Sequence, residues 1–164
     1  MGNGLTFPRN LVGWAELHAG VTELADEVAV RLRGHGLKCT TLQVTIRDPN
    51  FKDICRQKRL SAPTYVAREL TETAMELIRA AWRENAPVRA LTLTAQALVE
   101  EGEAGEQLDL FAAGAAPRRD KLEKLEKAMD GIRGKFGRDA IAPASTVHRD
   151  RAEVKAEQRL PPVD

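Results

Sequence analysis

The sequence has no long apolar run, and its N-terminus lacks a targeting signal. No stretch of the 164 residues approaches the roughly 20 consecutive apolar residues that cross a bilayer, so we expect no membrane insertion. The first ten residues lack the basic segment followed by an apolar stretch that marks a secretory signal. These absences favour a cytoplasmic protein without disulfides.

Metal-ligating residues are scarce as well. Cys39 and Cys55 are the only cysteines, and two thiols without a C-x-x-C pair or a nearby histidine cannot complete a zinc site. We therefore interpret both as reduced packing residues. The three histidines, His18, His35 and His148, do not have metal-ligand spacing.

Catalytic and nucleotide-binding motifs are also missing. Neither G-x-x-x-x-G-K-[ST] nor G-x-G-x-x-G occurs. Ser145, His148 and Asp150 could be written as a triad, but such groups act only when a fold holds them in contact, and these fall in an expected tail. The acids show no pair at neighbouring strand ends that would hold Mg²⁺. An enzyme of small-molecule metabolism thus has little support, and we predict no catalytic centre and no cofactor in this chain.

Charge is unevenly distributed, although the net charge is only +1. Residues 31–59 contain eight Lys or Arg against two Asp, whereas residues 100–109 contain five acids and no base. This separation indicates that basic and acidic functions lie in different parts of the chain.

Apolar residues recurring at steps of three and four predict two helices in the first hundred residues. The first runs from Trp14 to Leu32 and is ended by Gly34. The second follows Thr64, which we predict to be its N-cap, and is stopped near Pro87. Each helix has one apolar stripe that must be covered.

Alternation of apolar and polar residues predicts strands over 38–47 and 87–99. The turn at 48–50 makes 51–60 the returning strand of a hairpin, and 4–9 is a short edge strand. The order β-α-β-β-α-β predicts an α+β fold, a split, ferredoxin-like sheet of four strands with both helices on one face, followed by a flexible C-terminal tail.

The helices must cover the apolar side of this sheet, so its polar side is left facing solvent. An open polar sheet with basic edges offers a surface to a polyanion. The alternative is that any two-layer α+β domain needs one hydrated face, and that threonine is simply a good strand residue.

The composition changes after Val99. We expect a folded domain over 1–101, a flexible linker over 102–120, and a segment over 121–164 that is partly ordered at best. Apolar residues at steps of three and four form a coiled-coil-like seam in that segment: Leu122, Leu125, Met129, Ile132 and Phe136. A stand-alone ferredoxin-like module that assembles with a protein partner through residues 122–136 is therefore an alternative interpretation.

The expected linker contains apolar side chains that no fold would bury. They belong to the stretch Gln107, Leu108, Asp109, Leu110 and Phe111. Burial of each such side chain in a partner stabilises by roughly 1.5–3 kcal/mol, enough for affinity on the order of micromolar. The stretch resembles the bacterial sliding-clamp-binding motif Gln-Leu-x-Leu-Phe, whose apolar side chains fill a clamp pocket. The alternative is a chance match or an edge strand.

Other segments extend this similarity: GNGLTFPRNL at the start, the basic hairpin, the helix after SAPT, the VRALTL strand and KAMDGIRGKFGRDAI. Together they resemble the C-terminal region, or little finger, of bacterial Y-family DNA polymerases of the DNA polymerase IV type. The similarity continues to about Ser145. It implies a domain that rests on primer-template DNA during translesion synthesis. It also implies that the catalytic palm and its Mg²⁺ lie upstream of Met1, so that this chain alone is not an enzyme, although its parent is a DNA-directed DNA polymerase.

The resemblance implies three kinds of partner: primer-template DNA, the sliding clamp and the upstream polymerase domains. The candidate DNA contacts are basic residues and polar residues of the sheet: Arg47, Arg56, Lys58, Arg59, Arg89, Thr41, Gln43, Thr45, Thr92 and Thr94. We expect them to contact phosphates, because a damaged template of any sequence must be held. Residues 52–59 do not alternate strictly, so the sequence leaves open which basic side chains there face DNA.

Overall fold

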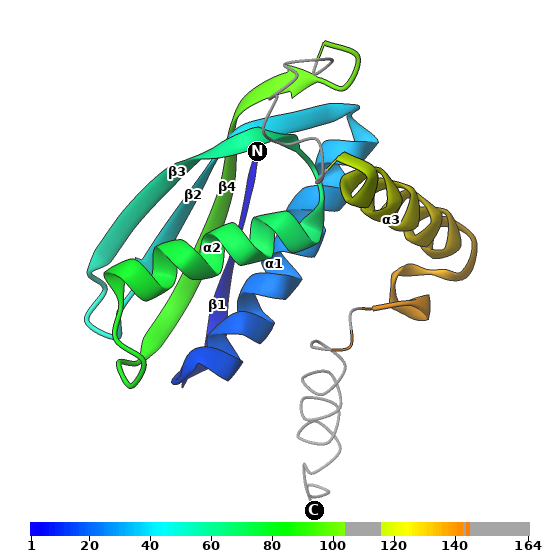
Figure 1. Ribbon diagram of the computed structural model, residues 1–164. Helices are drawn as coiled ribbons and strands as arrows, with labels where there is room; N and C mark the ends of the chain where they lie inside the picture. Colours follow the sequence, from blue (N-terminus) through cyan, green and yellow to red (C-terminus); the bar gives the residue numbers. More distant parts are fainter. Residues whose placement is uncertain (104–115, 143, 145–164) are drawn as a thin grey trace, which may run out of the picture.

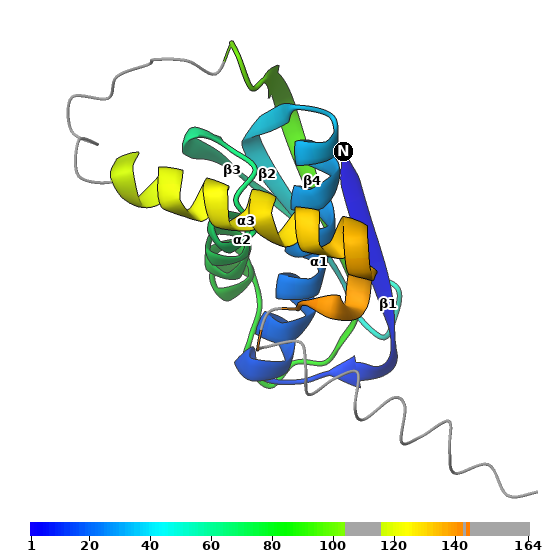
Figure 2. The same ribbon diagram turned by 90° about the vertical axis from the view of Figure 1, so that its right-hand side faces the viewer.

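The computed structural model describes residues 1–103, 116–142 and 144, whose arrangement is shown in Figures 1 and 2. The elements in chain order are β1 (Gly2–Leu11), α1 (Trp14–Gly34), β2 (Leu37–Arg47), β3 (Asp53–Thr64), α2 (Ala67–Ala81), β4 (Val88–Glu100), α3 (Ala116–Phe136) and the short helix η1 (Arg138–Ala140). None of the helices in these ranges is long and apolar enough to cross a membrane. The predicted α+β fold with β-α-β-β-α-β order is confirmed.

The strands form one antiparallel sheet in the order β1-β4-β2-β3. At its centre, Val44 of β2 lies opposite Leu93 of β4, and Ile46 lies opposite Leu91. Directly opposite residues project from the same face of a sheet. The apolar positions of both central strands therefore share one face.

The helices α1 and α2 lie on that apolar face, side by side (Figure 1). The core forms where they meet the sheet. Leu17 and Leu24 of α1 and Leu70 and Ile78 of α2 are almost fully buried. Burial of such a side chain stabilises the fold by roughly 1.5–3 kcal/mol, so the predicted apolar stripes account for the position of both helices.

The junction between β3 and α2 differs from the prediction. β3 continues to Thr64, and α2 begins at Ala67, so Thr64 is a strand residue whose hydroxyl accepts a hydrogen bond from the Val66 N–H at 3.0 Å. Pro63 is compatible with a strand here because β3 is at the edge of the sheet. The acceptor at the start of α2 comes from a distant residue, since the Ala67 N–H donates to Oε1 of Glu126 at 2.8 Å.

Helix α3 lies across α1 and α2 (Figure 2). It starts at Ala116, inside the range expected to be linker, and contacts the domain through its polar side. Ion pairs make this contact: Arg119–Glu69 at 2.8 Å, Lys38–Glu123 at 2.8 Å, Arg33–Asp130 at 2.6 Å and Arg133–Asp26 at 2.9 Å. Much of the predicted apolar seam instead faces solvent, with Leu125, Ile132 and Phe136 exposed by 56%, 40% and 76%.

Arg33 is at the centre of the α3 contact, and its side chain is only 4% exposed. Its guanidinium donates to both carboxylate oxygens of Asp130, at 2.6 and 3.0 Å, and to Glu126. Burial raises the pKa of Glu126 to about 7, although the charge of Arg33 and the Ala67 N–H oppose this, and the nearby carboxylates of Asp26 and Asp130 add to the increase.

We predict that the docking of α3 weakens as the pH rises from 5 to 8. Between the ordinary pKa of a glutamate, 4.5, and the raised pKa of about 7, the folded protein holds the Glu126 proton more tightly than the unfolded chain, so the free energy of unfolding falls with increasing pH and levels off above that range. Urea unfolding of the wild type should show a decrease on the order of 1–3 kcal/mol that is absent in Glu126→Gln, which keeps the oxygen acceptor for Ala67. Parallel pH profiles of the two proteins would contradict this assignment.

Candidate nucleic-acid interface

The side of the sheet opposite α1 and α2 carries no helix in the part of the chain that the structure describes (Figures 1 and 2). The strand register assigns its residues, which we call the open face: Gly2, Gly4 and Thr6 of β1; Ala90, Thr92, Thr94 and Gln96 of β4; Thr41, Gln43, Thr45 and Arg47 of β2; and Asp53, Cys55, Gln57 and Arg59 of β3. All the predicted threonine and glutamine contacts lie on this surface.

Hydroxyl and amide groups occupy the middle of the open face. Nε2 of Gln96 donates to Oε1 of Gln43 at 2.7 Å, which orients both amides. Thr41, Gln43 and Thr45 are only partly buried, so their polar groups reach solvent. Side chains of these types are common partners of phosphate oxygens.

The edge strand β1 contributes glycine to this surface. A Cβ added at Gly2 would lie 2.8 Å from Oγ1 of Thr94, and one at Gly4 would lie 2.7 Å from Oγ1 of Thr92. Real Cβ atoms do not approach oxygen so closely without displacing it. The missing side chains thus leave the threonine hydroxyls of β4 accessible beside bare backbone.

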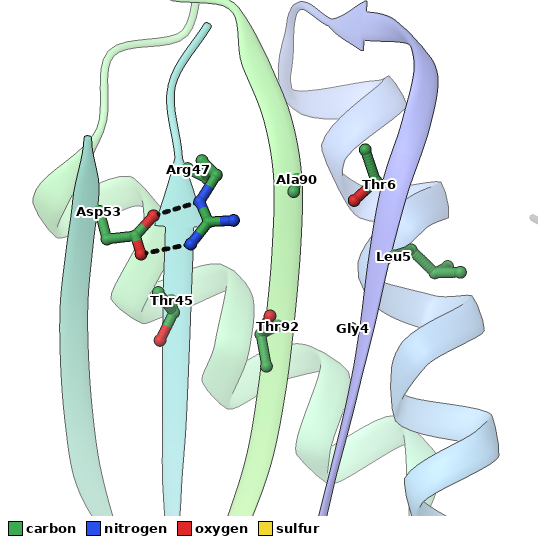
Figure 3. A pocket seen from close by; sticks show the side chains of 8 residues that line it. All are labelled: Gly4, Leu5, Thr6, Thr45, Arg47, Asp53, Ala90 and Thr92. Atoms are coloured by element: carbon green, nitrogen blue, oxygen red, sulfur yellow. Dashed lines mark hydrogen bonds and ion pairs between the residues drawn. The ribbon is translucent and has the colours of Figure 1, made fainter. Parts of the chain in front are cut away.

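A shallow hollow with a volume of about 230 Å³ lies at one end of the open face (Figure 3). It is lined by Gly4, Leu5, Thr6, Thr45, Arg47, Asp53, Ala90 and Thr92. Pockets for small organic ligands usually measure about 300–1,000 Å³ and are mostly apolar. This smaller, polar hollow is better suited to one group on the surface of a large ligand.

A bidentate ion pair between Arg47 and Asp53 lines one side of the hollow. Nε and Nη2 of Arg47 each donate to a carboxylate oxygen of Asp53 at 2.7 Å (Figure 3). The hydrogen bond and the opposite charge raise the pKa of Arg47 and lower that of Asp53. Both side chains are more than 40% exposed (46% and 42%), where water screens the attraction. A phosphate group can therefore compete with Asp53 for the guanidinium.

The structure separates four of the five predicted basic residues into two groups. Arg47 and Arg59 lie on the open face. Arg56 and Lys58 lie opposite buried residues of β2, and so belong to the helix side of the edge strand. The ion pair between Lys58 and Glu76 of α2 agrees with this placement. The open face and these two cations consequently point in different directions.

Arg89 is the second residue of β4, and its side chain reaches the turn between β2 and β3. The carbon at the centre of its guanidinium is 4.7 Å from the ring centroid of Phe51, which belongs to that turn. Phe51, Gly2 and Gly4 were not identified from the sequence. Two features of the sequence could have indicated them: an aromatic residue directly after the turn residues Asp-Pro-Asn, and glycine at alternate positions of the first strand.

Several predicted features cannot be located in the fold. The clamp-like motif at residues 107–111 lies outside the described residues. So do Ser145, His148 and Asp150, the three residues that could be written as a triad. Within the described ranges, no group of three or more His, Cys, Asp or Glu could hold a metal ion. Both cysteines are free thiols, but Cys55 is exposed, so its prediction as a packing residue is wrong.

Residues 1–110 match the impB/mucB/samB family C-terminal domain. The chain belongs to this family. Relatives of this C-terminal domain include the DNA polymerases IV of Acetivibrio thermocellus, 34% identical over 137 residues, of Bacillus velezensis, 30% identical over 155 residues, and of Oceanobacillus iheyensis, 35% identical over 141 residues. The predicted resemblance to the C-terminal region of DNA polymerase IV is confirmed.

The alignments cover 84%, 94% and 86% of this chain but only 34%, 36% and 33% of the relatives. The chain therefore spans about a third of the length of the curated relatives it matches. Because up to 94% of the chain is aligned, the similarity continues beyond residue 110, where the match to the C-terminal domain family ends.

For this impB/mucB/samB C-terminal domain, we predict that Asp53→Asn strengthens binding to duplex DNA several-fold at low salt. The change removes one negative charge from the open face and leaves Arg47 available to phosphate. Glu76→Gln is the matched control, because it removes a carboxylate that pairs with Lys58 on the helix side. Fluorescence anisotropy of labelled duplex DNA measures both; equal gains in the two variants would show that net charge, and not the open face, sets the affinity.

Proposed function

We propose that this domain is the non-catalytic DNA-binding and clamp-tethering region of a translesion DNA polymerase. The observation that carries the proposal is the open face, a helix-free polar surface within the described residues of a chain whose relatives are DNA polymerases IV. A C-terminal domain of such homologues is consistent with a DNA-binding role. The upstream part of the parent protein would supply the palm carboxylates and Mg²⁺, and we place the protein in the cytoplasm.

The domain would grip the phosphate backbone of primer-template DNA. Thr41, Gln43, Thr45, Thr92 and Thr94 would donate hydrogen bonds from the middle of the open face. Arg47 and Arg59 would supply charge from its two ends, and Arg89 would extend the contact past the hollow. Contacts of this kind position a protein on DNA but carry no sequence information. The proposal therefore requires binding that is insensitive to sequence.

The clamp would be bound through the motif at residues 107–111, which lies outside the described residues. The flanks of the motif at residues 107–111 are held on the helix side: Glu101, at the end of β4, accepts a hydrogen bond from the Tyr65 hydroxyl at 2.7 Å and pairs with Lys127 of α3 at 2.8 Å. Tyr65 is fully buried. The described residues on either side of the motif are thus anchored away from the open face, and the proposal assigns DNA and the clamp to different parts of the chain.

We predict that affinity for duplex DNA falls steeply and linearly on a plot of log affinity against log salt concentration. Bound phosphates release counterions, and the slope measures their number. Arg59→Ala should make the slope shallower by about 1, whereas Arg56→Ala, on the other side of the same strand, should leave it unchanged. Salt titrations with two unrelated duplex sequences test this. Tight binding that ignores salt, or that prefers one sequence, would exclude backbone recognition by the open face.

We further predict that the double variant Leu110→Ala/Phe111→Ala loses at least tenfold in affinity for the sliding clamp and keeps its affinity for DNA. Two side chains that fill the clamp pocket would be removed, each contributing roughly 1.5–3 kcal/mol. Leu125→Ala/Phe136→Ala is the matched control, because it removes exposed apolar groups from α3. Surface plasmon resonance on immobilised clamp measures the affinities. Equal losses of clamp affinity in both double variants would show that residues 107–111 do not tether the domain to the clamp.

A second candidate function is favoured by the apolar side chains that α3 exposes. Leu125, Ile132 and Phe136 face solvent although α3 is docked. The domain could be a stand-alone interaction module that assembles with a protein partner through residues 122–136. This alternative requires no affinity for DNA, so the salt titration separates it from the proposal above.

A further inference from the structure

An exposed aromatic ring stands at the tip of the β2–β3 hairpin. Phe51 is 65% exposed, in a turn that follows the last residue pair of the hairpin, Arg47 and Asp53. The same pair lines the hollow of the open face. A ligand that extends along the open face past this hollow would therefore reach the turn that carries the ring.

The turn holds Phe51 in a conformation that bulky residues rarely adopt. Its φ angle is 63°, in the left-handed region where the Cβ atom meets the neighbouring carbonyl. Hydrogen bonds on both sides impose this conformation: the Asp48 carboxylate accepts from Asn50 and Lys52, at 2.8 and 2.9 Å, and the Phe51 N–H donates to the Asp48 carbonyl at 3.1 Å. Glycine would fit this position with less strain.

A core contact does not explain the aromatic ring at this strained position. Phe51 is not among the residues of the hydrophobic core. Its described partner is Arg89, whose guanidinium lies 4.7 Å from the ring centroid. Because Arg89 covers one side and the residue remains largely exposed, the other side of the ring faces solvent. Strained residues that are held by their surroundings occur preferentially at functional sites.

We propose that the Phe51–Arg89 pair is a stacking site for an unpaired nucleobase of the bound DNA. A flat ring with one free face matches a base, which stacks on aromatic side chains whatever its identity, and an adjacent arginine adds cation–π attraction and a partner for phosphate. Paired bases inside a duplex are already stacked on their neighbours. The site would thus engage single-stranded template next to the duplex. This proposal rests on the proposed function, because it requires DNA along the open face.

The test uses the whole chain and two DNA hairpins with the same duplex, one blunt and one with a 5′ single-stranded overhang containing 2-aminopurine. Phe51→Gly removes the ring and relieves the strained φ angle, so the fold is retained; thermal unfolding checks this. The variant should bind the overhang DNA about 5- to 30-fold more weakly and the blunt DNA within twofold of the wild type. Phe51→Trp should restore overhang binding and quench 2-aminopurine fluorescence.

The possible outcomes separate this site from the proposed function. Wild-type affinity for the overhang DNA in Phe51→Gly would overturn the stacking site and leave the DNA-binding role intact. Equal losses for blunt and overhang DNA would also overturn it, because the ring would then act on the duplex or on the shape of the turn. Absence of binding to either hairpin by the wild type would overturn both proposals.

Discussion

The alternation of apolar and polar side chains along the two central strands is the constraint on which the whole arrangement depends. Val44 and Leu93 face the helices, and their neighbours Thr45 and Thr92 face the other way. A shift of one residue in the pairing would exchange the two faces, burying hydroxyls and exposing the core. The register that stabilises the domain therefore also creates the open face. Stability and the proposed DNA contact cannot be varied independently on β2 and β4.

The sequence was sufficient to predict the parts of the fold that have a clear period. Apolar stripes and alternation located α1, α2, β2 and β4, and their order gave the topology. The predictions were less accurate where contacts distant in sequence decide the structure. Thr64 has the chemistry of an N-cap, but the start of α2 is stabilised by Glu126 of α3, and no local pattern reveals such a partner. Arg56 and Lys58 face the helix side because the β2–β3 register places them there.

Charge was the least predictable property of the candidate site. Residues 31–59 form a basic run in the sequence, but several of its cations are paired with acids from distant elements: Arg33 and Lys38 with α3, and Lys58 with α2. All three pairs neutralise positive charge on the helix side, and those of Arg33 and Lys38 also hold α3 in place. The acids of α3 that face these cations are consequently part of the electrostatics of the domain. What remains for a polyanion on the open face is a smaller, polar surface with cations at its two ends.

In the proposed function, the open face and the hairpin tip suit two different parts of a nucleic acid. A phosphate backbone needs accessible donors on a smooth surface, and the absent side chains of Gly2 and Gly4 keep the hydroxyls of β4 uncovered. A base needs a protruding flat ring, and Phe51 provides one at a conformational cost that glycine would have avoided. The protein thus has glycine where the DNA backbone would lie, and an exposed aromatic ring where the stacked duplex would end. A surface that was merely hydrated would require neither feature.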